Sequence, residues 1–285
     1  IMAEAIGFDF KRGRLDSTQG HPSSGGMPDD ARITARCHED NFLPGLFAAV
    51  HEGGHGLYKQ GQPAAWRFQP AGDDLGMAVH ESQSMIIEYQ ACMTDECMDF
   101  IALKANQIFG QDPSLTADNL IRHTRQVQPS LIRVEADELT YPMHVLLRFE
   151  LEKAIIEGEL DVKDLPQAWN DGMQKRLGIK PSSPAQGHMQ DVHWPVGAQG
   201  YFPAYTLGAM MAAQFFAAAQ QAHPNLKAEL AQGNFEPLRN WQRQHIHSRG
   251  SLVTAEELIQ DATGEGLNSD HYLRHFRTRY LNGPQ

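Results

Sequence analysis

The sequence predicts a mainly α-helical protein with a small β element beside one central helix. Apolar residues recur at helical spacing through most of the 285-residue chain, from about residue 41 to the end. Residues 31–37 instead alternate small or apolar residues with polar ones, as a half-exposed strand does. No repeat, low-complexity tract or linker interrupts the chain, so we expect residues 1–285 to form a single domain.

The first 28 residues contain repeated Gly and Pro, which predicts extended or looped chain with little room for a helix. Residues 8–10 and Leu15 are candidates for short strand pieces. His21 lies in this loop, and a lone loop histidine is usually just solvated. The alternation in residues 31–37 then predicts a strand with one polar face.

A central amphipathic helix is predicted over residues 41–60, where Leu43, Phe47 and Val50 share one face. The remaining elements follow from periodicity, caps and breakers. Pro142 falls inside a helical pattern and predicts a kink or break there. Further helices are predicted over residues 79–109, from 115 onward with Thr116 as cap, and over 133–157, 161–177 with Asp161 as cap, 210–222, 224–232, 235–248, 254–263 and 269–281.

The central helix carries the sequence His-Glu-Gly-Gly-His at residues 51–55. His51 and His55 are four residues apart, so they lie on one helix face and can bind one metal ion together. Glu52 beside them can take a proton from a water at that ion. This is the H-E-x-x-H pattern of zinc peptidases. In a His-rich chain the pattern arises by accident in roughly a few per cent of sequences, so a third ligand is needed to support it.

A carboxylate on the next helix is a common third ligand after this motif. The chain offers Glu81, Glu88 and Asp95 there. Glu81 is favoured because it begins the helical stretch and is followed by polar residues. The alternative for Glu81 is a carboxylate stabilised by the helix dipole, with no metal role.

Composition limits the class of protein further. A formal net charge of −11 argues against a nucleic-acid partner. No apolar run is long enough to span a bilayer, and charges occupy the place where a signal peptide needs an apolar core. Cys37, Cys92 and Cys97 are too few for a disulfide framework. We therefore expect a cytoplasmic protein in which the three thiols lie in the core.

The segment HEGGHGLYKQG, followed by Glu81 in HESQS, resembles the carboxypeptidase Taq family of metallocarboxypeptidases. The resemblance extends over essentially the whole chain, because further family signatures occur in order. These are HP at His21, DARIT at residues 30–34, IRVEADE at 132–138, GHMQDVHW at 187–194 and YFPAYTLG at 201–208.

This resemblance implies a zincin-like metallopeptidase helical domain that releases single residues from the C-termini of peptides. It implies that His51, His55 and Glu81 bind zinc, with cobalt as an alternative. Glu52 would then be the general base, taking a proton from the attacking water and delivering it to the leaving amine.

The resemblance also implies catalytic and substrate-binding residues beyond the motif helix. A donor to the oxyanion is expected among His193, Tyr201 and Tyr205, each of which could equally be a core residue. His21, in the HP signature, is assigned to substrate binding.

Arg133 matches the position where the family places an arginine for the substrate's free carboxylate, a task suited to a guanidinium. The alternative is a surface ion pair with Glu135 or Asp137. Asp137 and Glu138 are expected to support the site from behind.

The chain also departs from the family pattern. We expect it to match only the carboxyl-terminal portion of longer relatives, as one catalytic portion that lacks their N-terminal helical region. Ser23 replaces an aromatic residue, Met85 replaces an arginine, and Gly53 and Gly56 should soften the motif helix.

Three hypotheses follow. The first is a metallocarboxypeptidase, expected as a homodimer, that acts on peptides with a free C-terminus and has no nucleic-acid or membrane partner. The second is a truncated homologue that binds metal or peptide without efficient turnover. The third is an endopeptidase or dipeptidase, which would not need Arg133.

Overall fold

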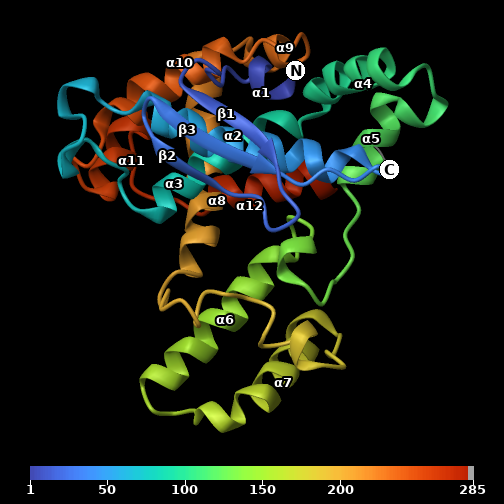
Figure 1. The fold of residues 1–285 in the computed structure, drawn as a ribbon, viewed down its shortest axis with the longest axis vertical. Helices are drawn as coiled ribbons and strands as arrows, with labels where there is room; N and C mark the ends of the chain where they lie inside the picture. The colour runs from blue at the N-terminus through green and yellow to red at the C-terminus, as the bar shows by residue number, and fades with distance from the viewer. Residues whose placement is uncertain (282–285) are drawn as a thin grey trace. The chain divides into compact units, whose positions relative to one another are not determined.

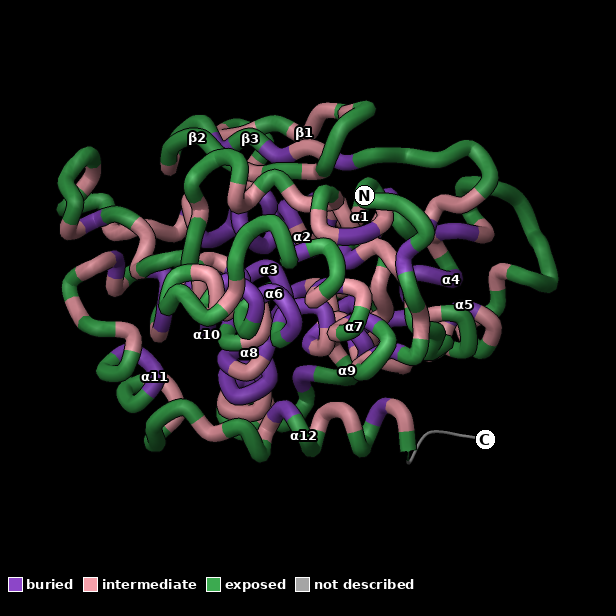
Figure 2. The backbone as a smooth tube through the Cα atoms, turned by 90° about the horizontal axis from the view of Figure 1, so that it is seen from below, coloured by how far each residue is buried: buried purple, intermediate pink, exposed green. Residues whose placement is uncertain are grey.

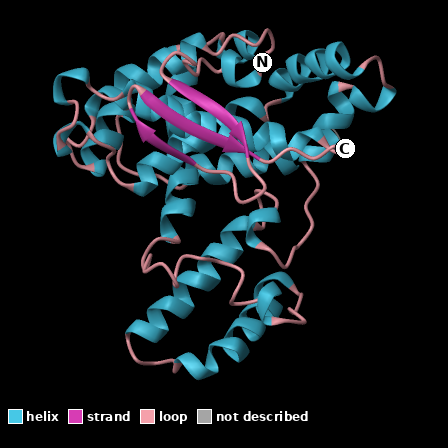
Figure 3. Cartoon of the chain, viewed as in Figure 1, coloured by secondary structure: helices cyan, strands magenta, loops and turns pink. Residues whose placement is uncertain are grey.

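The computed structural model describes residues 1–281 and divides the chain into two compact units. Unit 1 comprises Ile1–Thr124 and the chain from Gly208 onward, and unit 2 comprises Arg125–Leu207. Both units are mainly helical, and the strands of the described chain all belong to unit 1 (Figures 1 and 3). The predicted fold class is confirmed. That both units serve one catalytic portion stays a prediction.

Unit 1 is built around the central helix α2. Its strands are β1 (Gly13–Ser17), β2 (Ser24–Met27) and β3 (Asp30–Ala35). Its helices are α1 (Met2–Ala5), α2 (Phe42–Gly61), α3 (Met77–Met85), a π-helix (Ile86–Cys92), α4 (Asp95–Phe109), α5 (Ala117–Thr124), α9 (Leu226–Leu230), α10 (Glu236–His245), α11 (Ala255–Thr263), α12 (Asp270–Phe276) and a second π-helix (Arg277–Leu281), with 3₁₀ turns at Ala64–Trp66, Pro70–Gly72, Pro113–Leu115 and His247–Arg249. Helix α8 (Pro203–Ala222) begins in unit 2 and continues into unit 1.

The three strands form one sheet in the order β1-β3-β2, with β3 parallel to β1 and antiparallel to β2. Ala31 and Ile33 of β3 are fully buried, and β3 packs on α2. The predicted strand therefore lies beside the motif helix, as expected. Leu15 lies in β1, whereas residues 8–10 lie outside the strands. The expectation of no early helix was wrong, because four residues suffice for α1 before Gly7 turns the chain at a positive φ of 93°.

Helix α2 is capped by Asn41, whose side chain accepts a hydrogen bond from the backbone N–H of Leu43. Three glycines then allow close packing along its length. A Cβ on Gly53 would lie 2.5 Å from Ile6 Cδ1, one on Gly54 2.5 Å from the carbonyl oxygen of Gln83, and one on Gly56 2.5 Å from Phe8 Cε2. Figure 2 shows the resulting buried stretches of α2 and α3. These glycines thus let neighbouring elements approach α2 closely. This close packing explains why glycine occupies helical positions where it would otherwise weaken the helix.

The predicted helix over residues 79–109 is interrupted. Helix α3 widens into the π-helix at Ile86, and α4 starts anew with Thr94 as its N-cap. The periodicity missed this break because apolar side chains continue to face the core across it. Cys92 and Cys97 are buried here as expected, but Cys37 is exposed.

Unit 2 contains α6 (Tyr141–Ile156), α7 (Leu165–Leu177) and 3₁₀ turns at Arg133–Glu135, Val162–Asp164 and Pro184–Gln186. Its core includes Leu147, Leu151, Trp169 and Met173.

The break predicted at Pro142 is confirmed, because the helical pattern over residues 133–157 is interrupted and α6 starts at Tyr141, with Pro142 in its first turn, where a missing N–H is tolerated. The predicted cap at Asp161 was wrong. Asp161 precedes a 3₁₀ turn and makes no side-chain cap, and α7 begins at Leu165.

No helix among residues 1–281 combines the length and the apolar character that crossing a bilayer requires.

Candidate metal centre

The side chains of His51, His55 and Glu81 meet where α2 packs against α3 in unit 1. One nitrogen of each imidazole and one carboxylate oxygen all lie within 4.8 Å of one another. His51 Nε2 is 3.6 Å from Glu81 Oε1, and His55 Nε2 is 3.6 Å from Glu81 Oε2. The glycine at position 54 makes this possible, because the backbone of α3 lies where a side chain on α2 would be.

The structure separates the three carboxylates considered as third ligands. Glu81 faces the Nε2 atoms of both histidines. Glu88 instead contacts His51 on its other nitrogen, with Oε2 2.7 Å from Nδ1. Asp95 begins α4 and is not part of the cluster. The arrangement favours Glu81 as the ligand, and its role stays a prediction.

The cluster fits a divalent cation in both donor type and charge. Two imidazoles and one carboxylate are the donors of a His₂Glu zinc site. Burial alone would lower the pKa of His51, but Glu88, Glu81 and Glu52 outweigh it and raise this pKa to about 10. The buried carboxylates of Glu81 and Glu52 and the half-buried one of Glu88 create a strongly negative environment around this imidazole, which a bound cation would neutralise.

Glu52 lies beside these ligands in the buried part of α2, only 6% exposed. Burial raises the pKa of its carboxyl above the ordinary value, while His51 and a hydrogen bond from Ser24 of β2 act against this. A carboxylate with a raised pKa accepts a proton more readily, as a general base must.

The other ring nitrogen of His51 and of His55, Nδ1, also makes a close contact in each case. Nδ1 of His51 contacts Glu88, and Nδ1 of His55 lies 2.6 Å from Nδ1 of His80. Such contacts behind a metal ligand fix the orientation of its ring. Sequence analysis assigned no role to His80, although its position directly before Glu81 is a usable signal.

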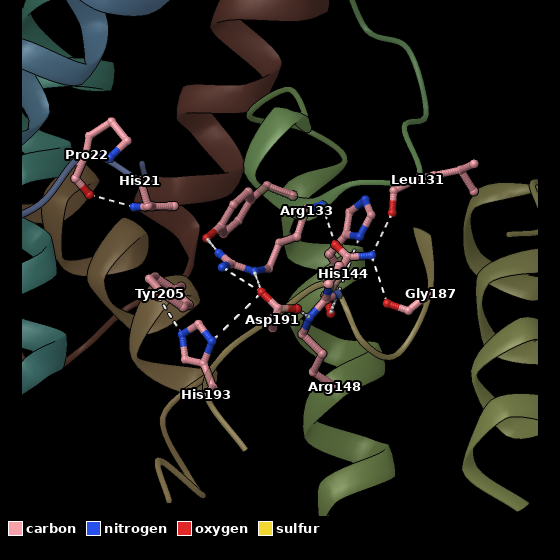
Figure 4. A network of polar contacts seen from close by, with 12 residues as sticks. His21, Pro22, Leu131, Arg133, His144, Arg148, Gly187, Asp191, His193 and Tyr205 are labelled. Atoms are coloured by element: carbon pink, nitrogen blue, oxygen red, sulfur yellow. Dashed lines mark hydrogen bonds and ion pairs between the residues drawn. The ribbon is translucent and has the colours of Figure 1, made fainter. Parts of the chain in front are cut away.

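Unit 2 brings Arg133, His193 and Tyr205 into one polar cluster around Asp191 (Figure 4). Arg133 is 5% exposed, and its Nε and Nη2 each lie 2.9 Å from Asp191 Oδ1. Its Nη1 donates to the hydroxyl of Tyr141. The alternative of an ion pair with Glu135 or Asp137 was therefore wrong, because the guanidinium is buried and faces Asp191.

His193, Tyr201 and Tyr205 also lie together in unit 2. His193 Nε2 is 2.9 Å from the Tyr205 hydroxyl, and the rings of His193 and Tyr201 are 5.2 Å apart between centroids.

Asp137 accepts hydrogen bonds from the backbone N–H groups of Leu139 and Thr140, just before α6.

His21 and Glu138 complete the predicted residues. His21 belongs to unit 1 and is exposed, with Nδ1 2.6 Å from the carbonyl oxygen of Pro22. Glu138 belongs to unit 2 and is buried.

Sequence reasoning missed Asp191 and Arg148. Arg148 is fully buried on α6, with Nε 2.6 Å from Asp191 Oδ2 and its guanidinium 4.6 Å from the centre of the Trp169 ring. Burial lowers the pKa of Arg148 to about 10, which still leaves it charged at neutral pH. An arginine within the apolar run of α6 was the available signal, because such a charge needs a buried partner.

A helical unit that holds two imidazoles and a carboxylate on adjacent helices has the architecture of the metallopeptidase class. The model of the family described as "Carboxypeptidase Taq (M32) metallopeptidase" matches residues 1–280. The chain belongs to this family.

Relatives agree with this assignment. Thermostable carboxypeptidase 1 of Thermus thermophilus is 40% identical over 280 residues, which are 98% of this chain and 55% of that protein. Carboxypeptidase 1 of Bacillus subtilis is 38% identical, over 98% of this chain and 56% of its own length. The chain thus spans just over half the length of these curated relatives. That it corresponds to their carboxyl-terminal portion stays a prediction.

Solved structures show the same fold. Metallocarboxypeptidase 1 of Trypanosoma cruzi matches with a TM-score of 0.95 at 37% identity, over 98% of this chain and 58% of the other. The M32 carboxypeptidase of Deinococcus radiodurans R1 matches with a TM-score of 0.94 at 38% identity, over 99% and 57%.

Proposed function

We propose that this chain carries the catalytic machinery of a metal-dependent carboxypeptidase that hydrolyses the last peptide bond of peptide substrates. The observation that carries the proposal is the convergence of His51, His55 and Glu81, with Glu52 beside them. Family membership supports the same class of reaction. Zinc is the proposed ion, since two imidazoles and a carboxylate suit it, with cobalt as an alternative.

In this proposal His51, His55 and Glu81 hold the ion. When bound, it supplies Lewis-acid chemistry, activating water and polarising the scissile carbonyl. A carboxylate oxygen of Glu52 takes one proton from the attacking water as the new C–O bond forms. The same oxygen then delivers that proton to the leaving nitrogen as the C–N bond breaks.

We propose that residues outside the motif helix bind the substrate. His193, Tyr201 and Tyr205 are candidate donors to the oxyanion. Arg133 is the candidate anchor for the free carboxylate, since a guanidinium has more N–H donors than its contacts with Asp191 and Tyr141 use. His21 is retained as a candidate substrate contact.

A second candidate is a homologue that binds metal or peptide with little turnover. The departures from the family pattern at Ser23 and Met85 are the observations that favour it. We further propose a cytoplasmic homodimer without nucleic-acid or membrane partners. The net charge of −11 supports the absence of a nucleic-acid partner.

Metal analysis of the purified chain, combined with hydrolysis of a blocked dipeptide bearing a free carboxylate, tests the proposal. We expect about one zinc ion per chain and cleavage that a chelator abolishes. Metal binding without cleavage would favour the second candidate. A chain that binds no metal would contradict both the proposed centre and the proposed reaction.

Replacing Arg133 by Met tests the substrate class. If Arg133 binds the terminal carboxylate, the preference for free over amidated peptides should fall by roughly ten- to a hundredfold, since hydrogen bonds to charged groups contribute about 1.5–3 kcal/mol. The ratio of the two rates within one variant is the measurement, so a general loss of folded protein cancels. Equal cleavage of free and amidated peptides by the unmodified chain would instead indicate an endopeptidase.

A further inference from the structure

The two imidazoles of the candidate metal centre are supported differently on the side away from Glu81. Nδ1 of His51 lies 2.7 Å from a carboxylate oxygen of Glu88. Nδ1 of His55 lies 2.6 Å from another imidazole nitrogen, Nδ1 of His80. A carboxylate can only accept a hydrogen bond, whereas an imidazole nitrogen can accept or donate. Nδ1 of His51 therefore carries a proton, whereas the proton position of His55 depends on His80.

Only one arrangement of the His55–His80 pair leaves His55 able to bind a metal. A neutral imidazole carries its proton on one nitrogen, and a metal needs the other. Since Nε2 of His55 faces Glu81, its proton must be on Nδ1, which donates to Nδ1 of His80. His80 must then carry its own proton on Nε2. In the opposite arrangement, His80 Nδ1 donates and the proton of His55 occupies Nε2.

A carboxylate faces the far nitrogen of His80. Nε2 of His80 is 3.5 Å from Oδ2 of Asp74, and His80 is only 8% exposed. At this distance the charge of Asp74 acts mainly through its field, which favours an N–H over a lone pair at Nε2. Asp74 is held in place by Lys59, whose Nζ lies 2.6 Å from the same oxygen, and by the side-chain amide of Gln62.

We propose that Asp74 is a positioning residue that acts through His80 to select the tautomer of His55 able to bind a divalent metal ion. The inference rests on the proposed metal centre and adds a residue that does not touch the ion. Lys59 is on α2, four residues after His55, so the same helix supplies the ligand and the cation that holds Asp74. Without Asp74, this cation would favour a lone pair at His80 Nε2 and hence the unproductive arrangement.

Asp73 provides a matched control. Its Oδ1 is 2.9 Å from the same Lys59 Nζ, and it lies in the same loop. Its side chain contacts Lys59, Gln62 and the Asp74 backbone, and its charge acts on His80 more weakly than that of Asp74. Asp73→Ala therefore removes a carboxylate from Lys59 without removing the one that faces His80.

The experiment compares the unmodified chain with Asp74→Ala, Asp74→Asn and Asp73→Ala. The zinc dissociation constant is measured by competition with a chromophoric chelator. The tautomer of His55 is measured in the metal-free proteins from ¹⁵N imidazole shifts. We expect Asp74→Ala to weaken zinc binding by about tenfold or more and to move the His55 proton from Nδ1 toward Nε2. Asp74→Asn, which keeps an acceptor without the charge, should be intermediate, and Asp73→Ala should change both quantities much less than Asp74→Ala does.

Two results would overturn the proposal. One is an Asp74→Ala protein indistinguishable from Asp73→Ala in both measurements. The other is weaker zinc binding without a change of tautomer, which would assign Asp74 a purely structural role. Should Asp74→Ala fail to fold, Asp74→Asn supplies the same comparison. A chain that binds no zinc would refute the proposed function, while its tautomer would still test the link from Asp74 to His55.

Discussion

Replacement of Glu52 by Gln should lower the rate of peptide hydrolysis by about a thousandfold while zinc binding persists. A general base contributes roughly 10²–10⁴-fold to a rate, and an amide cannot take the proton that the carboxylate takes. Gln keeps the size of the side chain, which matters because Glu52 is buried beside His51. The measurements are kcat/KM for a blocked dipeptide and the zinc content of the same preparation.

Glu39→Gln is a suitable control for this experiment, because it removes an exposed carboxylate from the same unit just before α2. It should change neither activity nor zinc content. A Glu52→Gln protein with at least a tenth of the original activity would show that another group accepts the proton. Loss of zinc together with activity would leave the base unassigned and point to a role for Glu52 in holding the centre.

Replacement of Asp191 by Ala should reduce the free energy of unfolding of unit 2 by about 3–5 kcal/mol. Asp191 is the shared carboxylate partner of Arg133 and Arg148, and both guanidiniums are buried. Removing one partner from a buried ion pair leaves an uncompensated charge, which is far more destabilising than losing an exposed pair. Urea unfolding followed by tryptophan fluorescence measures the loss, since Trp169 and Trp194 lie in this unit.

Glu150→Ala is the matched control, because it removes the more exposed partner of Arg176 in the same unit and should cost less than about 1 kcal/mol. Equal effects of the two substitutions would contradict the assignment.

The difference in unfolding free energy between the Asp191→Ala protein and the unmodified chain should also depend on pH. Burial alone would raise the pKa of Asp191, but Arg133 and Arg148 outweigh it and hold the pKa below its usual value. This stabilisation is present at neutral pH and is lost as the pH falls through the pKa of the folded state.

Local chemistry made the centre of the fold predictable. The helix around residues 41–60 and its cap follow from periodicity and from Asn41, and observed α2 differs by one residue at each end. The i and i+4 spacing of His51 and His55 places both imidazoles on one face whatever the tertiary structure. Glu81 was the favoured third ligand because it was expected to begin the next helix, but α3 starts at Met77 and Glu81 lies one turn inside it.

The parts that sequence reasoning missed depend on contacts between distant residues. Asp191 pairs with Arg148 although the two are 43 residues apart in the chain, and the sequence around each of them does not indicate the pairing. His80 meets His55 only because Gly54 lets α3 approach α2. The change from α-helix to π-helix at Ile86 was missed for a related reason, because apolar side chains face the core on both sides of it.

The π-helix from Ile86 to Cys92 makes this segment sensitive to chain length rather than to side-chain identity. Each of its turns contains more residues than an α-helical turn, so Glu88 occupies an angular position that a regular continuation of α3 would give to a neighbour. Removing Ile86 or Ile87 would shift each following residue by one helical position, a rotation of about 100° about the axis. Glu88 would then turn away from His51. In this stretch the number of residues between Glu81 and Thr94 is itself a structural constraint, and substitutions should be tolerated more readily than insertions or deletions.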